Sequence, residues 1–142
     1  SRPMKRTLED LSRGAALLAS IAGLVTLLQF NRGQDFEKEK LALEMFRDYS
    51  KDKREFDGNN APSDADTRAF AVTTQYAAET IYRFRTGNPG WEETVMGMIK
   101  DNESALLTVK GWHCRSMDRK YYCAMQKVLK GRLDCDVAPT CP

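Results

Sequence analysis

The residue types in this chain that could perform chemistry lie together near its C-terminal end. The single histidine, His113, precedes Cys114, and three further cysteines follow at Cys123, Cys135 and Cys141. A histidine beside a cysteine could form a nucleophile pair or supply metal ligands. However, the cysteines are separated by eight, eleven and five residues, without the C-x-x-C pair of zinc or c-type haem sites. We therefore expect no metal and no cofactor.

Disulfide formation is the main prediction for these cysteines. An even number of them, gathered at one end, is typical of a disulfide-stapled region in an oxidising compartment. Three pairings are open, and buried free thiols are the alternative. Bonds that join residues 132–142 to the preceding helices would explain how a segment with two prolines and no periodicity stays ordered.

Motifs of common enzyme classes are absent from the sequence. There is no phosphate-binding glycine loop, no dinucleotide fingerprint and no G-x-S-x-G motif. The carboxylate pairs Glu92–Glu93 and Asp134–Asp136 are residues that helix starts and turns use routinely. We expect no catalytic residue, and an enzyme that uses Cys114 with His113 is kept as an alternative.

A basic cluster is the second candidate site. Residues 110–132 contain seven Lys or Arg side chains against one Asp, although the whole chain has a net charge of only +2. Such a cluster could bind anionic lipid headgroups or an acidic partner surface, and nucleic acid is not expected. The alternative is a solvated helix face whose tyrosines are core residues. The candidate contact residues are Trp112, Arg115, Arg119, Lys120, Lys127 and Lys130.

The elements that must position these residues are all predicted to be helical. Ser63 with Asp66 forms a capping box, and Asn88 followed by Pro89 is a second helix start. No alternating strand pattern is present, so we expect an all-α protein with a small helical bundle. Apolar residues at helical spacing predict helices over about 36–56, 64–86, from 89, 104–110 and 116–130. The expected buried face of the helix over 64–86 is made of Phe70, Thr73, Ala77, Ile81 and Phe84.

An apolar stretch near the N-terminus predicts a membrane helix over residues 14–32. Gly14 to Phe30 carries no charge and would form roughly 25 Å of helix, with no polar stripe. A buried core helix and an uncleaved signal are the alternatives. Ala15, Ala19 and Gly23 form a ridge of small residues that would let another membrane helix pack closely.

These predictions divide the chain into four segments. They are a short amphipathic segment (1–13), the membrane helix (14–32), a helical extramembrane domain (33–131) and a cysteine- and proline-containing tail (132–142). Basic residues flanking the membrane helix favour a cytoplasmic N-terminus by a small margin. The cysteine cluster agrees, because that orientation places it in a periplasm-like space.

Three stretches carry a resemblance: "LLQFNRG", "LALEMFRDYS" and "AAETIYRFRTGNPGWEETV". Together they resemble uncharacterised bacterial single-pass membrane proteins with a small helical domain after one membrane helix. That resemblance implies a membrane-anchored domain and brings no catalytic residues with it. The cysteine-containing tail departs from the pattern.

The expected function follows from the predicted anchor and the basic cluster. We expect a non-catalytic accessory subunit of a larger integral membrane complex, in contact with the lipid bilayer. By analogy, an energy-transducing assembly (photosynthetic or respiratory) is the kind of host that collects such subunits. The alternative is a membrane-tethered sensor or regulatory domain that binds a protein or a ligand.

Overall fold

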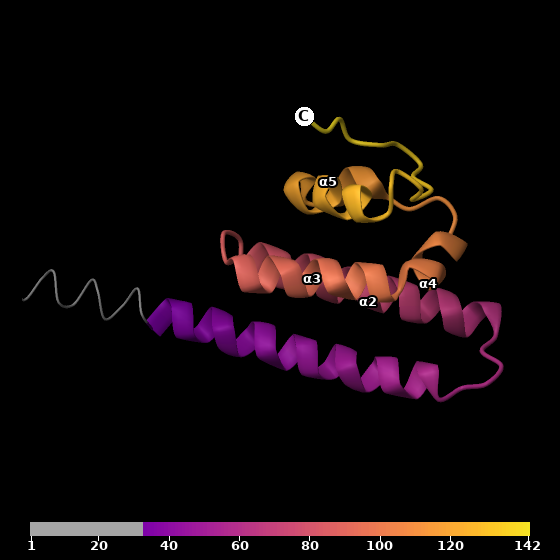
Figure 1. The fold of residues 1–142 in the computed structure, drawn as a ribbon, viewed down its shortest axis with the longest axis horizontal. Helices are drawn as coiled ribbons and strands as arrows, with labels where there is room; N and C mark the ends of the chain where they lie inside the picture. Colours follow the sequence, from indigo (N-terminus) through magenta and orange to yellow (C-terminus); the bar gives the residue numbers. More distant parts are fainter. Residues whose placement is uncertain (1–32) are drawn as a thin grey trace, which may run out of the picture. The chain divides into compact units, whose positions relative to one another are not determined.

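Helices make up most of the described chain, which in the computed structural model comprises residues 33–142 (Figure 1). The all-α prediction is confirmed for these residues, which contain no strand and only an isolated bridge between Trp112 and Cys135. Residues 38–142 form one compact unit. The helices are a helix covering 33–57, α2 (Asp64–Phe84), α3 (Pro89–Asp101), α4 (Glu103–Thr108), the short 3₁₀ helix η1 (Cys114–Ser116) and α5 (Arg119–Val128).

Both predicted helix starts are confirmed by their hydrogen bonds. The Ser63 hydroxyl accepts from the Asp66 amide at 3.0 Å, and the Asp66 carboxylate accepts from the Ser63 amide at 3.1 Å, which completes the capping box of α2. The Asn88 side chain accepts from the Trp91 amide, and Pro89 occupies the first turn of α3. Gly87, between the two helices, has a φ of +84°, a conformation that favours glycine.

The helix at 33–57 packs on α2 and α3 through aromatic side chains from residue 38 onward. Phe56 stacks on Phe70 of α2, with ring centroids 4.3 Å apart, and Phe46 meets the edge of Trp91 of α3. The Trp91 indole N–H donates to the Glu39 carboxylate at 2.9 Å. These contacts bury one side of this helix and leave its charged side in solvent.

α2 lies at the centre of the bundle, which changes its predicted buried face. Phe70, Ala77 and Ile81 are buried as expected. Thr73 and Phe84 are exposed, against the prediction, and Thr74 is buried in place of Thr73. The reason is that α2 packs against α3, α4 and α5 as well as the preceding helix. Its buried stripe is therefore wider than one amphipathic face.

The last two predicted helices are shorter than expected. The helix predicted over 104–110 is α4, and the one predicted over 116–130 begins only at Arg119. Asp118 caps α5 by accepting from the Tyr121 amide at 3.0 Å, and η1 occupies the residues before it. Tyr121, Met125 and the following Leu129 are fully buried.

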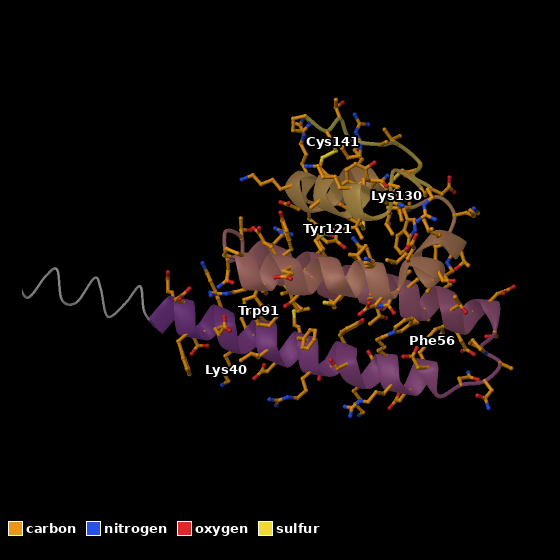
Figure 2. The ribbon with its side chains drawn as sticks, viewed as in Figure 1. Lys40, Phe56, Trp91, Tyr121, Lys130 and Cys141 are labelled. Atoms are coloured by element: carbon orange, nitrogen blue, oxygen red, sulfur yellow. A yellow bond between two sulfur atoms is a disulfide. The ribbon has the colours of Figure 1, made fainter. Side chains whose placement is uncertain are left out.

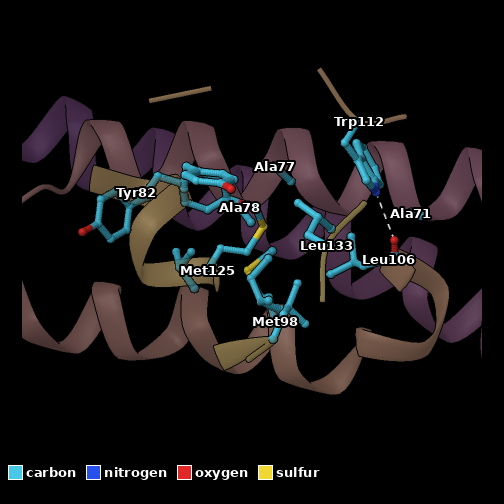
Figure 3. Close-up of a cluster of buried hydrophobic side chains, with 14 of the residues drawn as sticks. Ala71, Ala77, Ala78, Tyr82, Met98, Leu106, Trp112, Met125 and Leu133 are labelled. Atoms are coloured by element: carbon cyan, nitrogen blue, oxygen red, sulfur yellow. Dashed lines mark hydrogen bonds between the residues drawn. The ribbon is translucent and has the colours of Figure 1, made fainter. Parts of the chain in front are cut away.

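The core joins α5 and the tail to α2, α3 and α4. Figure 3 shows Met125 of α5 beside Met98 of α3, with Leu106 of α4 and Leu133 of the tail in the same cluster. The Trp112 indole N–H donates to the Leu106 carbonyl at 3.0 Å. A single core therefore sets the position of α5 and of the segment that follows it.

Two disulfides tie the tail to this core. Cys114 of η1 is bonded to Cys135, and Cys123 of α5 is bonded to Cys141. The disulfide prediction is confirmed, and the alternative of free thiols is wrong. The Trp112 amide donates to the Asp134 carbonyl at 2.8 Å, which holds the start of the tail along the segment before η1.

The predicted membrane helix at 14–32, with Ala15, Ala19 and Gly23, lies outside the described residues, as does the segment 1–13. Within residues 33–142, no helix is both long enough and apolar enough to cross a bilayer.

Candidate functional site

A groove beside α5 gathers four of the predicted contact residues. Its volume is about 860 Å³, within the size range of pockets that bind ligands. We call it the α5 groove. Its walls come from α2, α5, the turn after α5 and the end of the tail, through Tyr82, Arg119, Lys120, Cys123, Ala124, Gln126, Lys127, Lys130, Gly131, Cys141 and Pro142.

Four cations line the α5 groove, and no aspartate or glutamate side chain is among its lining residues. Arg119, Lys120, Lys127 and Lys130 are all exposed, and none of them forms a salt bridge with a described carboxylate. Like charges that converge without counter-charges create a positive potential that attracts anions. The groove is therefore electrostatically suited to an anionic ligand.

Two acidic residues at the start of α5 and on α2 are occupied by other contacts. The Asp118 carboxylate accepts from an amide of its own helix. The Glu79 carboxylate accepts from the Asp118 amide at 2.9 Å and from the Gln75 side chain at 2.9 Å. These groups cap α5 and fasten it to α2, so they do not line the groove.

Two of the groove's features are unfavourable for the local backbone and helix electrostatics. Arg119 and Lys120 occupy the first turn of α5, where the partial positive charge of the helix dipole disfavours cations. Lys130 has a φ of +53°, in the left-handed region, and it is the only non-glycine residue with positive φ in the described chain. Lys130 occupies the left-handed position of the motif that ends α5, in which the Gly131 amide donates to the Gln126 carbonyl and the Lys130 amide to the Lys127 carbonyl; glycine is the commonest residue at this position.

The end of the tail closes one side of the groove. The Cys123–Cys141 disulfide fixes the tail to α5, and the Arg119 Nε donates to the Thr140 carbonyl at 2.9 Å. Figure 2 shows Cys141 above α5, with Lys130 near the turn that follows the helix. Arg119 therefore both holds the wall and contributes charge.

Only four of the six predicted contact residues lie together in the structure. Arg119, Lys120, Lys127 and Lys130 come together in the α5 groove, whereas Arg115 is exposed on η1 and does not line it. The prediction that Trp112 contacts a partner is wrong. This residue is only 7% exposed and its indole N–H is hydrogen-bonded inside the protein, so it belongs to the core.

Burial and ion pairing decide the roles of three further residues of the basic cluster. Tyr121 and Tyr122 are core residues, as the solvated-face interpretation expected of the tyrosines. Arg132 is not available for a ligand in the same way as the groove cations, because it pairs with Glu103.

Nucleophilic chemistry finds no support at His113 and Cys114. The Cys114 sulfur is fully buried and bonded to Cys135, so it cannot act as a thiolate. His113 instead lies 2.7 Å from the Asp136 carboxylate at the surface, and this hydrogen bond, with one from the Val137 amide, holds the pKa of Asp136 below its ordinary value. Among residues 33–142, no three His, Cys, Asp or Glu side chains are grouped to hold a metal ion.

Sequence reasoning missed the groove's neutral walls. Tyr82 comes from α2, far from α5 in sequence, and burial raises the pKa of its hydroxyl, which stays neutral. Gln126 is positioned by two contacts, since it donates to the Tyr122 hydroxyl and accepts from the Leu133 amide. The charge pattern alone indicated the four cations.

Comparison with known proteins assigns no family. No family model matches the chain, and no curated protein or solved structure is detectably similar to it. The resemblance to bacterial single-pass membrane proteins therefore stays a prediction from the sequence.

Proposed function

We propose that the chain is a non-catalytic accessory subunit of a larger membrane protein complex, and that its α5 groove binds an anionic surface of the host. The observation that carries this proposal is the convergence of four cations, without carboxylate partners, in one groove. The charged residues that line the groove are all cations, which favours binding of an anionic surface.

The membrane part of the proposal rests on the sequence of residues 14–32. Its uncharged length and its ridge of small residues, Ala15, Ala19 and Gly23, suit packing against a membrane helix of the host. The two disulfides support a domain on the periplasmic or equivalent side, because disulfides persist in oxidising compartments. By analogy, an energy-transducing assembly is the kind of host that we propose.

A membrane-tethered regulatory domain is the second candidate function. It is favoured by the volume of the α5 groove, which would also hold a small anionic ligand. The two candidates differ in what stays with the protein after extraction. A subunit remains in its host complex, whereas a tethered regulator separates as a folded protein of small size.

The test is native-size separation after extraction from the native membrane in a mild detergent. The full chain should migrate with a large complex in fixed ratio, and a Lys127→Glu/Lys130→Glu variant should be lost from it. The matched control, Lys51→Glu/Lys100→Glu, makes the same charge change at exposed positions outside the groove and should stay in the complex. Migration of the unaltered chain as a folded monomer or small oligomer would refute the subunit proposal.

A further inference from the structure

We infer that the α5 groove holds an extended acidic peptide segment of the host protein, with two acidic ends separated by an apolar side chain. This inference rests on the proposed function, since it names the chemistry of the partner at the same site. It follows from how the charges and the neutral walls are distributed along α5.

The cations form two groups, one at each end of α5. Arg119 and Lys120 lie in its first turn, whereas Lys127 lies in its last turn and Lys130 in the following turn. Seven residues of helix, from Lys120 to Lys127, rise roughly 11 Å along the axis. Two acidic groups that meet both ends must be separated by about the same distance, which three or four residues of an extended peptide span.

The middle of the groove is neutral. Ala124 and the Cys123–Cys141 disulfide lie between the two cationic groups, and Tyr82 is 9% exposed beside them. The short Ala124 side chain leaves room for a side chain of the ligand, and a neutral wall favours an apolar one. A segment of the form acidic–apolar–acidic therefore matches the groove along its length.

A peptide fits this surface better than a bilayer does. A membrane-binding face places large apolar side chains around its cations, where they enter the headgroup region. The large exposed apolar side chains of α2, which are Val72, Tyr76 and Phe84, do not line the groove. The groove is hollow, and the charged ends of Lys and Arg side chains surround it, which suits a protruding chain segment.

The test uses the full chain in nonionic detergent and three blocked hexapeptides. The first has glutamates at positions 2 and 5, leucine–alanine between them and serine at both ends; the second has the same composition with its two glutamates adjacent; the third replaces glutamate by glutamine. Affinities are measured by titration at about 0.01 M ionic strength, where charges act over about 30 Å. The first peptide should bind more tightly than the second, and the third should not bind.

Two variants tie the binding to the groove. Lys130→Asn removes a charge while keeping a residue that tolerates the left-handed conformation, so the fold is expected to persist. It should weaken the first peptide by about fivefold, the upper end for one exposed ion pair. Lys100→Asn, at an exposed position of α3, should leave the affinity unchanged.

Several outcomes would overturn the inference. Equal affinity for the two acidic peptides would exclude the spacing argument, and no binding of either would exclude an acidic peptide altogether. Tighter, Lys130-dependent binding of soluble dihexanoyl phosphatidylglycerol would assign the groove to a lipid headgroup instead. If the chain stays in its complex while the peptides fail to bind, the subunit proposal survives with another docking surface. If the peptides bind but no complex is found, the peptide-binding inference survives and the subunit proposal is refuted.

Discussion

Removal of the buried disulfide, in the variant Cys114→Ala/Cys135→Ala, should strongly destabilise the domain. The bond joins residues 21 apart in sequence. A loop of that length corresponds to about 11 cal/mol/K of lost unfolded-state entropy, or about 3 kcal/mol at 25 °C. Because Cys114 is fully buried, loss of its sulfur should remove about 1 kcal/mol of packing in addition. The expected loss of about 4 kcal/mol is a large part of a typical domain's stability.

The second disulfide provides a matched comparison. Cys123 and Cys141 are 18 residues apart, so the same entropy relation again gives about 3 kcal/mol. However, Cys141 is exposed and the tail beyond Asp136 is mostly in solvent. Without the bond, this end can separate from α5 while the core stays folded, which raises the entropy of the folded state too. Cys123→Ala/Cys141→Ala should therefore cost only about 1 kcal/mol of global stability.

The assay is urea unfolding of the full chain in nonionic detergent, followed by far-ultraviolet circular dichroism. Equal slopes of free energy against urea would show that each variant unfolds over the same surface. The buried-disulfide variant should also melt roughly 10 to 20 °C lower. Equal losses in the two variants would refute the argument that the tail frays, and a loss below about 1 kcal/mol in the first would refute the role given to the buried bond.

Four further predictions concern stability, pH and redox behaviour. Tyr121→Phe should raise the unfolding free energy by about 1 kcal/mol, because the buried hydroxyl has no hydrogen-bond partner among the described residues; a loss in urea unfolding would contradict this. Burial raises the pKa of Tyr49 and Tyr121, so the folded state keeps protons that the unfolded state releases, and stability should fall as the pH rises above about 10. A melting temperature that does not change between pH 9 and 11 would oppose that reasoning. Asn102→Ala should cost about 2 to 3 kcal/mol, since the buried Asn102 amide donates to the Tyr49 hydroxyl at 2.6 Å and its loss leaves that group unpaired; thermal unfolding measures it. In a dithiothreitol titration with alkylation and mass spectrometry, Cys141 should be modified before Cys114, because only the former is exposed; the opposite order would contradict the described burial.

Lys130 links the stability of the domain to the groove. A lysine in the left-handed conformation is disfavoured by roughly 1 kcal/mol or more, and asparagine adopts that conformation more readily. Lys130→Asn should therefore keep or slightly raise the unfolding free energy while it weakens anion binding. If Lys130→Asn lowers both the unfolding free energy and the anion affinity, Lys130 stabilises the fold, and its left-handed conformation is not a cost to stability.

Local chemistry made several features of this protein readable from its sequence. Ser63 with Asp66, and Asn88 with Pro89, specify helix starts through side-chain contacts to amides a few residues away, so no distant partner is needed. The cysteine count and clustering predicted disulfides for the same kind of reason. The charge pattern likewise located the basic cluster at residues 110–132, which contains the four groove cations and also Arg115.

Features that depend on packing could not be read in that way. Thr74 is buried in place of Thr73 because α2 is covered on several sides, and one amphipathic face is the wrong template for such a helix. Trp112 has the composition of a contact residue, but its indole meets the Leu106 carbonyl in the core. The pairing of the cysteines also required the tertiary structure, since their spacing allowed three connectivities.

The sequence by itself determined the helical class, the helix caps, the disulfide region and the basic cluster, because each depends on residue type and short-range spacing. Only the tertiary structure decided that four cations of this cluster share one groove, with Tyr82 from α2 on one side and Cys141 from the tail on the other. The physical reason is that a groove is made by segments that a common core and a disulfide bring together, and neither leaves a periodic signal in the chain.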